Sequence, residues 1–206
     1  MGKVDLNKKQ KKTALLDSAF RLFMENGFNK TSISDIVNDA GVAKGTFYLY
    51  FQDKYDIRRN LIGHKANQVF WSAYTEMNNQ KVTVFEEQVI FIVNHVLDAF
   101  SKNKSLVLFI SKHLSWGFFK SSLIQSDYGD DKNIYEAYEK LLKASGNTYK
   151  NPEIMIYMII ELVGSASYNS ILYGEPVAIE VLKPHLYDAI RDIMRRELID
   201  NSSQKD

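Results

Sequence analysis

The most constraining feature of the sequence is the stretch from Asp39 to Phe51, which has the pattern of a turn followed by a short second helix. Gly41 stands where a tight turn between two short helices requires a residue that adopts positive φ without strain. Phe47 and Phe51 follow four residues apart and therefore share one helical face, which predicts packing on that face. The remaining faces can then meet a partner, as in a helix-turn-helix.

The side chains predicted to point outward have the chemistry of a DNA-binding surface. Lys44 can neutralise a phosphate or reach a base edge, and Thr46 can contact a base. The hydroxyls of Tyr48 and Tyr50 can hydrogen-bond phosphate oxygens. Gly45 costs about 1 kcal/mol relative to alanine within a helix, and its missing Cβ would let the backbone approach a duplex closely. The alternative is an ordinary surface helix with a weak N-terminus.

A phosphate-binding loop for a nucleotide is excluded by residue order. Such a loop needs a lysine directly after its last glycine and before Ser or Thr, whereas here Lys44 precedes Gly45.

Two further helices are predicted before the turn. Apolar residues recur at spacings of three and four from Thr13 to about Asn26, and Gly27 is a natural residue to follow the end of that helix. Ser32 and Asp35 form a capping box for the second helix. The Thr31 and Ser32 hydroxyls, beside its N-terminal amides, predict a phosphate clamp. Before these helices stands a polar arm, predicted to track phosphates, that contains Lys8, Lys9, Lys11 and Lys12.

Asp53 is predicted to cap a long fourth helix, with Lys54 near the DNA backbone. Positive charge is concentrated in the same part of the chain. The net charge is only +1, but residues 1–59 hold 11 Lys and Arg against 7 Asp and Glu, and the rest hold 15 against 18. This asymmetry suits a small DNA-facing module joined to a larger domain.

The ordered series of motifs from about Lys11 to Ile62 resembles the N-terminal domain of the TetR family of bacterial transcriptional regulators. The motifs are Ala19-Phe20-Arg21-Leu22-Phe23, Asn26-Gly27-Phe28, Thr31-Ser32-Ile33, Asp35-Ile36, Ala40-Gly41-Val42, Lys44-Gly45-Thr46-Phe47-Tyr48-Leu49-Tyr50-Phe51 and Lys54. Leu49 and Tyr50 depart from the tyrosine and histidine that many members have there.

The resemblance implies an all-α fold of about nine helices, with a three-helix DNA-binding head at residues 1–56 and a ligand-binding and dimerisation domain at residues 57–206. It implies a repressor that binds a palindromic operator in double-stranded DNA as a dimer and is released by a small effector. The residues matching the family's DNA contacts are Thr31, Ser32, Lys44, Gly45, Thr46, Tyr48, Tyr50 and Lys54.

The second part of the chain is also predicted to be helical, since proline is nearly absent and no strand pattern of useful length occurs. The long helix is predicted to continue over Leu61 to Met77. Further helices are predicted over Phe85 to Phe100, Leu106 to Ser121 and, after Asn151-Pro152, as far as Leu172, with Gly174 closing the last of these. A final helix is predicted to begin at Pro184. The dense aromatic residues predict a pocket for an apolar or aromatic effector. Its candidate lining residues, which a packed core would equally explain, are Trp71, Tyr74, Phe91, Phe109, Trp116 and Tyr168.

The last two predicted helices carry more apolar surface than one core face needs, and Gly164, Ser165, Ala166 and Ser167 allow close helix approach. We therefore expect a homodimer through these helices. The start of the chain lacks a signal-peptide core, and no apolar run approaches the ~20 residues of a membrane span, which predicts a cytoplasmic protein.

Other classes of function are disfavoured. Cysteine is absent, which excludes disulfides and thiolate chemistry. No catalytic or metal-binding motif was found, so we expect no enzyme, cofactor or metal; Asp127, Asp130 and Asp131 do not have the spacing of a calcium loop. The alternative is a helical ligand-binding or protein-interaction module without specific DNA binding, against which Lys44, Tyr48 and Lys54 argue.

Overall fold

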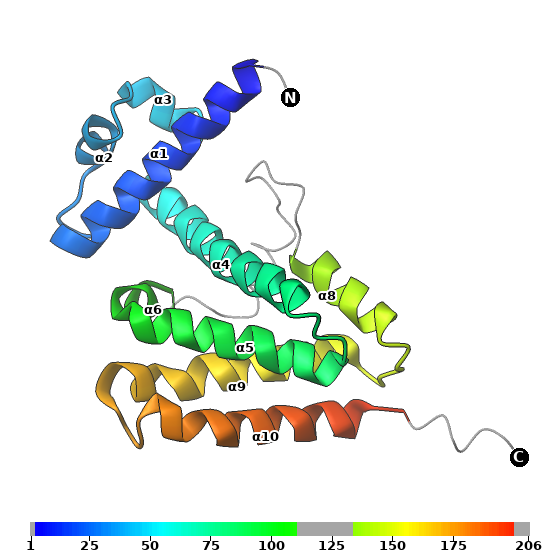
Figure 1. Cartoon of the computed structure of the whole chain (residues 1–206). Coiled ribbons are helices and arrows are strands. Elements are labelled where there is room, and N and C mark those ends of the chain that lie inside the picture. Colours follow the sequence, from blue (N-terminus) through cyan, green and yellow to red (C-terminus); the bar gives the residue numbers. More distant parts are fainter. Residues whose placement is uncertain (1–2, 111–133, 200–206) are drawn as a thin grey trace, which may run out of the picture. The chain divides into compact units, whose positions relative to one another are not determined.

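The computed structural model describes residues 3–110 and 134–199 of the 206-residue chain. In these residues the regular structure is nine α-helices, as the sequence predicted, with one isolated bridge between Tyr149 and Leu198. The helices, labelled in Figure 1, are α1 (Lys3–Asn26), α2 (Ile33–Asp39), α3 (Lys44–Tyr48), α4 (Lys54–Asn79), α5 (Phe85–Lys102), α6 (Lys104–Ile110), α8 (Ile134–Ala144), α9 (Pro152–Tyr173) and α10 (Ile179–Glu197).

The contacts divide the described residues into two compact units. One unit, the head, ends at Lys65, and the other, the effector unit, begins at Ala66. Helix α4 supplies residues to both units, and the boundary predicted after residue 56 lies inside this helix. That predicted boundary stays a prediction.

The head is built on α1, which is longer than the sequence indicated. The helix starts at Lys3, so the lysines predicted to form an arm are helical. It ends where predicted, before Gly27, which has φ +82°. Its buried residues pack with those of α2, α3 and α4 to form the core of the head, which contains Leu15, Leu16, Ala19, Phe23, Ile36, Val37, Phe47, Phe51, Ile57, Leu61 and Ile62.

Helices α5, α9 and α10 lie side by side in the effector unit (Figure 1). Helix α9 opens at Pro152 and is closed by Gly174, which has φ +73°, both as predicted. Helix α10 corrects a prediction, because it begins at Ile179 and Pro184 lies inside it. The turn before the proline stays helical because Ile179 and Lys183 are both buried there.

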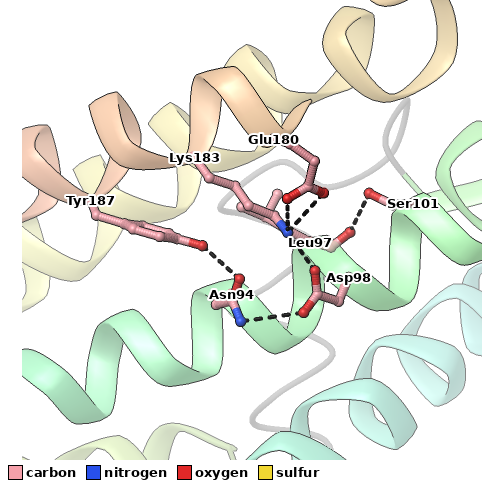
Figure 2. Close-up of polar contacts among 7 residues, drawn as sticks. All are labelled: Asn94, Leu97, Asp98, Ser101, Glu180, Lys183 and Tyr187. Atoms are coloured by element: carbon pink, nitrogen blue, oxygen red, sulfur yellow. Dashed lines mark hydrogen bonds and ion pairs between the residues drawn. The ribbon is translucent and has the colours of Figure 1, made fainter. Parts of the chain in front are cut away.

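A polar network ties α10 to α5 (Figure 2). Lys183 of α10 donates to Asp98 of α5 and to Glu180, while the Tyr187 hydroxyl donates to Asn94 Oδ1 at 2.6 Å. Asn94 in turn donates to Asp98. Burial lowers the pKa of Lys183, but the hydrogen bonds to Asp98 and Glu180 outweigh it, so the pKa is raised and the lysine stays charged.

One helix was missed from the sequence, and one prediction lies partly outside the described residues. Helix α8 was not predicted, although its buried Ile134, Ala137, Tyr138 and Leu141 have helical spacing. The helix predicted from Leu106 to Ser121 coincides with α6 as far as Ile110. The rest of it, with Trp116 and the aspartates at 127, 130 and 131, lies outside the described residues.

Helix α9 departs from the expected absence of an apolar segment of spanning length. By length and composition alone it qualifies as a membrane span, although the core helix of a soluble protein passes the same test. A third of its apolar window is buried within the chain. Most of the apolar window of α9 is therefore not buried within the chain.

The core of the head generates a stability prediction. Phe47 is completely buried, so Phe47→Ala is expected to lower the free energy of unfolding by roughly 3–5 kcal/mol. Leu49→Ala is the matched control, because Leu49 is 78% exposed and its loss should cost less than about 0.5 kcal/mol. Urea denaturation of the two variants measures both values. Equal stabilities would contradict the packing described here.

Candidate nucleic-acid interface and effector cavity

The helix-turn-helix is formed by α2, the turn at Gly41 and α3. Ser32 caps α2 with the predicted capping box, in which Ser32 Oγ accepts from the Asp35 amide at 3.1 Å and the Ser32 amide donates to Asp35 Oδ2 at 2.8 Å. The Ser32 amide and then its hydroxyl lower the pKa of Asp35, so this carboxylate stays charged. Gly41 has φ +64°, the conformation for which the sequence predicted a glycine.

Helix α3 buries one side and exposes the other. Phe47 inside the helix and Phe51 just beyond it are both buried, as their spacing predicted. Lys44 and Gly45 are exposed, and the Tyr48 side chain is 54% exposed. Two further predicted contacts, Thr46 and Tyr50, are half-buried. We call Lys44, Gly45, Thr46, Tyr48 and Tyr50 the α3 face.

No packing among the described residues requires a glycine at position 45. A Cβ atom there would meet none of their atoms within 4 Å, and the backbone of Gly45 is not left-handed. Space is therefore open at the first turn of α3, where an external backbone could approach.

Leu49 was not among the predicted site residues, but it is 78% exposed directly after α3. An exposed leucine next to Tyr48 extends the α3 face with an apolar group that suits a thymine methyl. The sequence could have indicated the exposure of Leu49, because this residue lies between two tyrosines that were predicted to point outward.

Thr31, one of the two residues of the predicted phosphate clamp, is buried. Its side chain is 1% exposed, and its hydroxyl donates to the carbonyls of Leu22 and Gly27. The Ser32 hydroxyl is exposed but donates to Asp35 Oδ2 at 2.7 Å. Both hydroxyls are engaged within the chain, and a carboxylate stands at the N-terminus of α2. The phosphate clamp stays a prediction.

Lys54, another predicted DNA contact, is engaged within the chain. Its ammonium donates to the carbonyls of Phe28 and Thr31, at 2.8 and 3.0 Å, and lies 4.4 Å from the centroid of the Phe28 ring. The lysine therefore binds the main chain of the loop between α1 and α2. Asp53 caps α4 as predicted, with its Oδ1 accepting from the Asp56 amide at 2.7 Å.

An ion pair between Arg21 of α1 and Asp39 at the end of α2 neutralises an acid in the helix-turn-helix. Hydrogen bonds from Arg21 and then from Ser18 lower the pKa of Asp39. The aspartate is thus charged and paired, which reduces its repulsion of a nearby polyanion.

The effector unit contains a cavity of about 180 Å³ between α4, α5, α8 and α9. The described residues that line it include no charged side chain, and the Tyr138 hydroxyl among them donates to the Pro152 carbonyl at 2.8 Å. Burial is the main cause that raises the pKa of Tyr138, so the phenol is neutral. The lining residues are Ala66, Val69, Phe70, Phe85, Val89, Ile92, Val93, Val96, Phe100, Ile134, Tyr135, Tyr138, Leu141, Ile156, Ile159, Ile160, Val163 and Gly164.

The predicted effector residues do not line this cavity. Trp71, Tyr74, Phe91, Phe109 and Tyr168 are absent from its wall, and Trp116 lies outside the described residues. The wall is instead mainly aliphatic. The feature of the sequence that could have indicated this wall is the apolar stripe of α5, which contains Val89, Ile92, Val93 and Val96.

In residues 3–110 and 134–199, no group of three or more His, Asp or Glu side chains comes together in a way that could hold a metal ion. On the surface, Ser72 Oγ and His95 Nε2 lie within hydrogen-bond distance, at 3.1 Å.

Comparison with known proteins agrees with the helix-turn-helix. Residues 15–61 match the family described as bacterial regulatory proteins, tetR family. A relative from Bacillus subtilis, named fatty acid metabolism regulator protein, is 36% identical over 88 residues, which are 43% of this chain and 45% of the relative. The chain thus spans about half the length of this curated relative.

Two solved structures share the fold over nearly the whole chain. Thermus thermophilus FadR, described as a TetR family transcriptional repressor in complex with lauroyl-CoA, is 14% identical with a TM-score of 0.60, covering 95% of this chain and 99% of its own. Bacillus subtilis FadR in complex with stearoyl-CoA is 18% identical with a TM-score of 0.55, covering 86% and 96%. Residues 15–61 are thus similar to the DNA-binding domain of the tetR family, and the chain as a whole shares the fold of these two solved structures.

Proposed function

We propose that this protein is a transcriptional repressor that binds a palindromic operator as a homodimer and releases it when a fatty-acyl effector binds. The observation that carries the DNA-binding part is the α3 face, which presents Lys44, Gly45 and Tyr48 outward while Phe47 is buried behind them. A basic side chain, an open backbone and a phenol on one short helix suit the major groove. A regulator of this kind acts in the cytoplasm, where the DNA is.

The cavity supports an acyl effector. Its apolar wall cannot pair a charged headgroup, so it suits a hydrocarbon chain whose polar end lies elsewhere. An apolar cavity of about 150 Å³ holds a benzene-sized molecule, and the cavity here is only slightly larger. A long acyl chain must therefore move the wall, to which α4 contributes Ala66, Val69 and Phe70.

Movement of α4 offers a route from effector to operator. This helix carries both the cavity residues just named and, at its start, residues of the head. A shift of α4 that alters the spacing of two heads would weaken operator binding by about 1–3 kcal/mol, or roughly 5- to 150-fold. The two α3 faces of a dimer must reach successive major grooves about 34 Å apart.

The exposed surface of α9 supports a homodimer. The helix has two charged residues, Glu153 and Glu161, and exposes Ile154, Tyr157 and Tyr173. An almost wholly apolar helix needs to be covered on more than one side. A second copy of α9 and α10 would cover it in a four-helix interface, with Ser165 exposed in the middle of α9.

Selection from a pool of random duplexes at moderate salt tests the proposed DNA binding. We expect a palindromic motif, and the variant Gly45→Ala should bind it at least about 10-fold more weakly, because the added methyl group separates α3 from the duplex. The same change removes the cost of a helical glycine, so thermal stability should not fall.

Lys140→Ala is the control for this selection, since Lys140 is exposed on α8. Undiminished binding by Gly45→Ala would show that the backbone of α3 does not approach DNA closely. Retention of no sequence at all would favour a ligand-binding or protein-interaction module instead.

The acyl effector is tested by filling the cavity. In Val93→Phe the larger side chain occupies space that the acyl chain needs, so release of the operator by lauroyl-CoA should require at least 10-fold more ligand. Operator binding without ligand should stay unchanged. Fluorescence anisotropy of a labelled duplex measures both quantities, with coenzyme A alone as the ligand control.

Val84→Phe is the matched variant, because Val84 is 62% exposed and does not line the cavity. A wild-type response of Val93→Phe to lauroyl-CoA would count against this cavity as the effector site.

The dimer is tested by size-exclusion chromatography with light scattering. Ser165→Arg places a long charged side chain in the proposed close approach of α9 and should shift the protein to a monomer at micromolar concentration. Ser105→Arg, at another exposed serine, on α6, should leave the dimer intact. A wild-type protein that elutes as a monomer would refute the proposed interface.

A further inference from the structure

Lys54 lies in the first turn of α4, where its ammonium group faces the loop between α1 and α2. Its Nζ donates to the carbonyls of Phe28 and Thr31, and both acceptors belong to that loop. An ammonium has three N–H donors, so these bonds use two of them. The Phe28 ring, 4.4 Å away, adds a cation–π contact.

The same loop is held from α1 as well. The hydroxyl of buried Thr31 donates to the carbonyls of Leu22 and Gly27, at 3.1 and 3.0 Å. The Phe28 ring packs against Phe23 and Tyr55, with 5.1 Å between centroids in each pair. Because α2 begins directly after this loop, fixing the loop fixes the start of the helix-turn-helix.

We infer that Lys54 is a positioning residue that orients α2 and α3 for DNA through the loop between α1 and α2, without itself neutralising a phosphate. The inference rests on the proposed DNA binding. Its basis is the geometry of one cation shared between two main-chain carbonyls and a ring. Loss of the ammonium would leave both carbonyls without this donor and allow the loop to move.

The salt dependence of operator binding separates positioning from phosphate contact. Each phosphate neutralised by a side chain contributes about 0.9 to the slope of log K against log salt concentration. We compare Lys54→Met, which keeps an unbranched stem, with Lys44→Met on the α3 face. Lys44→Met should reduce the slope by about 1. Lys54→Met should weaken binding at least 10-fold at every salt concentration and leave the slope unchanged.

These titrations are made well below the thermal transition, where both variants are folded. A residue that merely adds stability would then leave operator affinity unchanged, and this result would overturn the inference. A slope reduced by about 1 in Lys54→Met would also overturn it, because Lys54 would then contact a phosphate directly.

A double-mutant cycle tests whether Lys54 acts through the loop. Thr31→Val removes the hydroxyl bonds that hold the same loop from α1 and should also weaken binding without changing the slope. The loss in Lys54→Met/Thr31→Val should be smaller than the product of the two single losses, since both changes loosen one segment. Independent, multiplicative losses would contradict action through the shared loop.

Amide hydrogen exchange keeps the inference testable if the wild-type protein binds no duplex. That result would refute the proposed function, whereas exchange in α2 still reports on the loop. We expect faster exchange of the α2 amides in Lys54→Met and unchanged exchange in Lys44→Met. Unchanged exchange in both variants would refute the positioning role independently of DNA binding.

Discussion

The burial of Phe47 and Phe51 is the constraint on which the proposed interface depends. Helix α3 spans Lys44–Tyr48, too short to be stable alone, so its orientation is set by the residues it buries. With Phe47 inside, the helical period leaves Gly45 and Tyr48 outside, and Lys44 is exposed at the first position of the helix. Any change in that packing would rotate the outward residues as well as lower stability.

Much of the head could be predicted because its signals are local. The capping box of Ser32 and Asp35, the positive φ of Gly41 and the spacing of Phe47 each depend on a few neighbouring residues. The resemblance predicts that Thr31 and Lys54 contact DNA, and residue type reveals their donor capacity. It does not reveal which acceptor the donor meets, and here the acceptors are main-chain carbonyls brought close by folding.

The cavity could not be located from the sequence for a different reason. Aromatic residues were predicted as its lining, and aromatic residues do line it, but at other positions, such as Phe70, Phe85 and Tyr138. Which side chains border the void depends on how the helices pack. Similarly, Pro184 suggested a helix start from local chemistry, whereas burial of Ile179 and Lys183 extends α10 beyond it.

The network around Lys183 has a consequence for the register of α10. Apolar contacts alone would let α10 shift along α5 at little cost, because apolar side chains can pack in a new register. Such a shift would separate the buried ammonium of Lys183 from Asp98 and the phenol of Tyr187 from Asn94. The polar contacts therefore favour one register of α10 on α5 over the adjacent registers. Since α9 packs on α10, this alignment also decides which apolar side chains stand next to one another on the outer surface, and hence which shape a second copy would have to match.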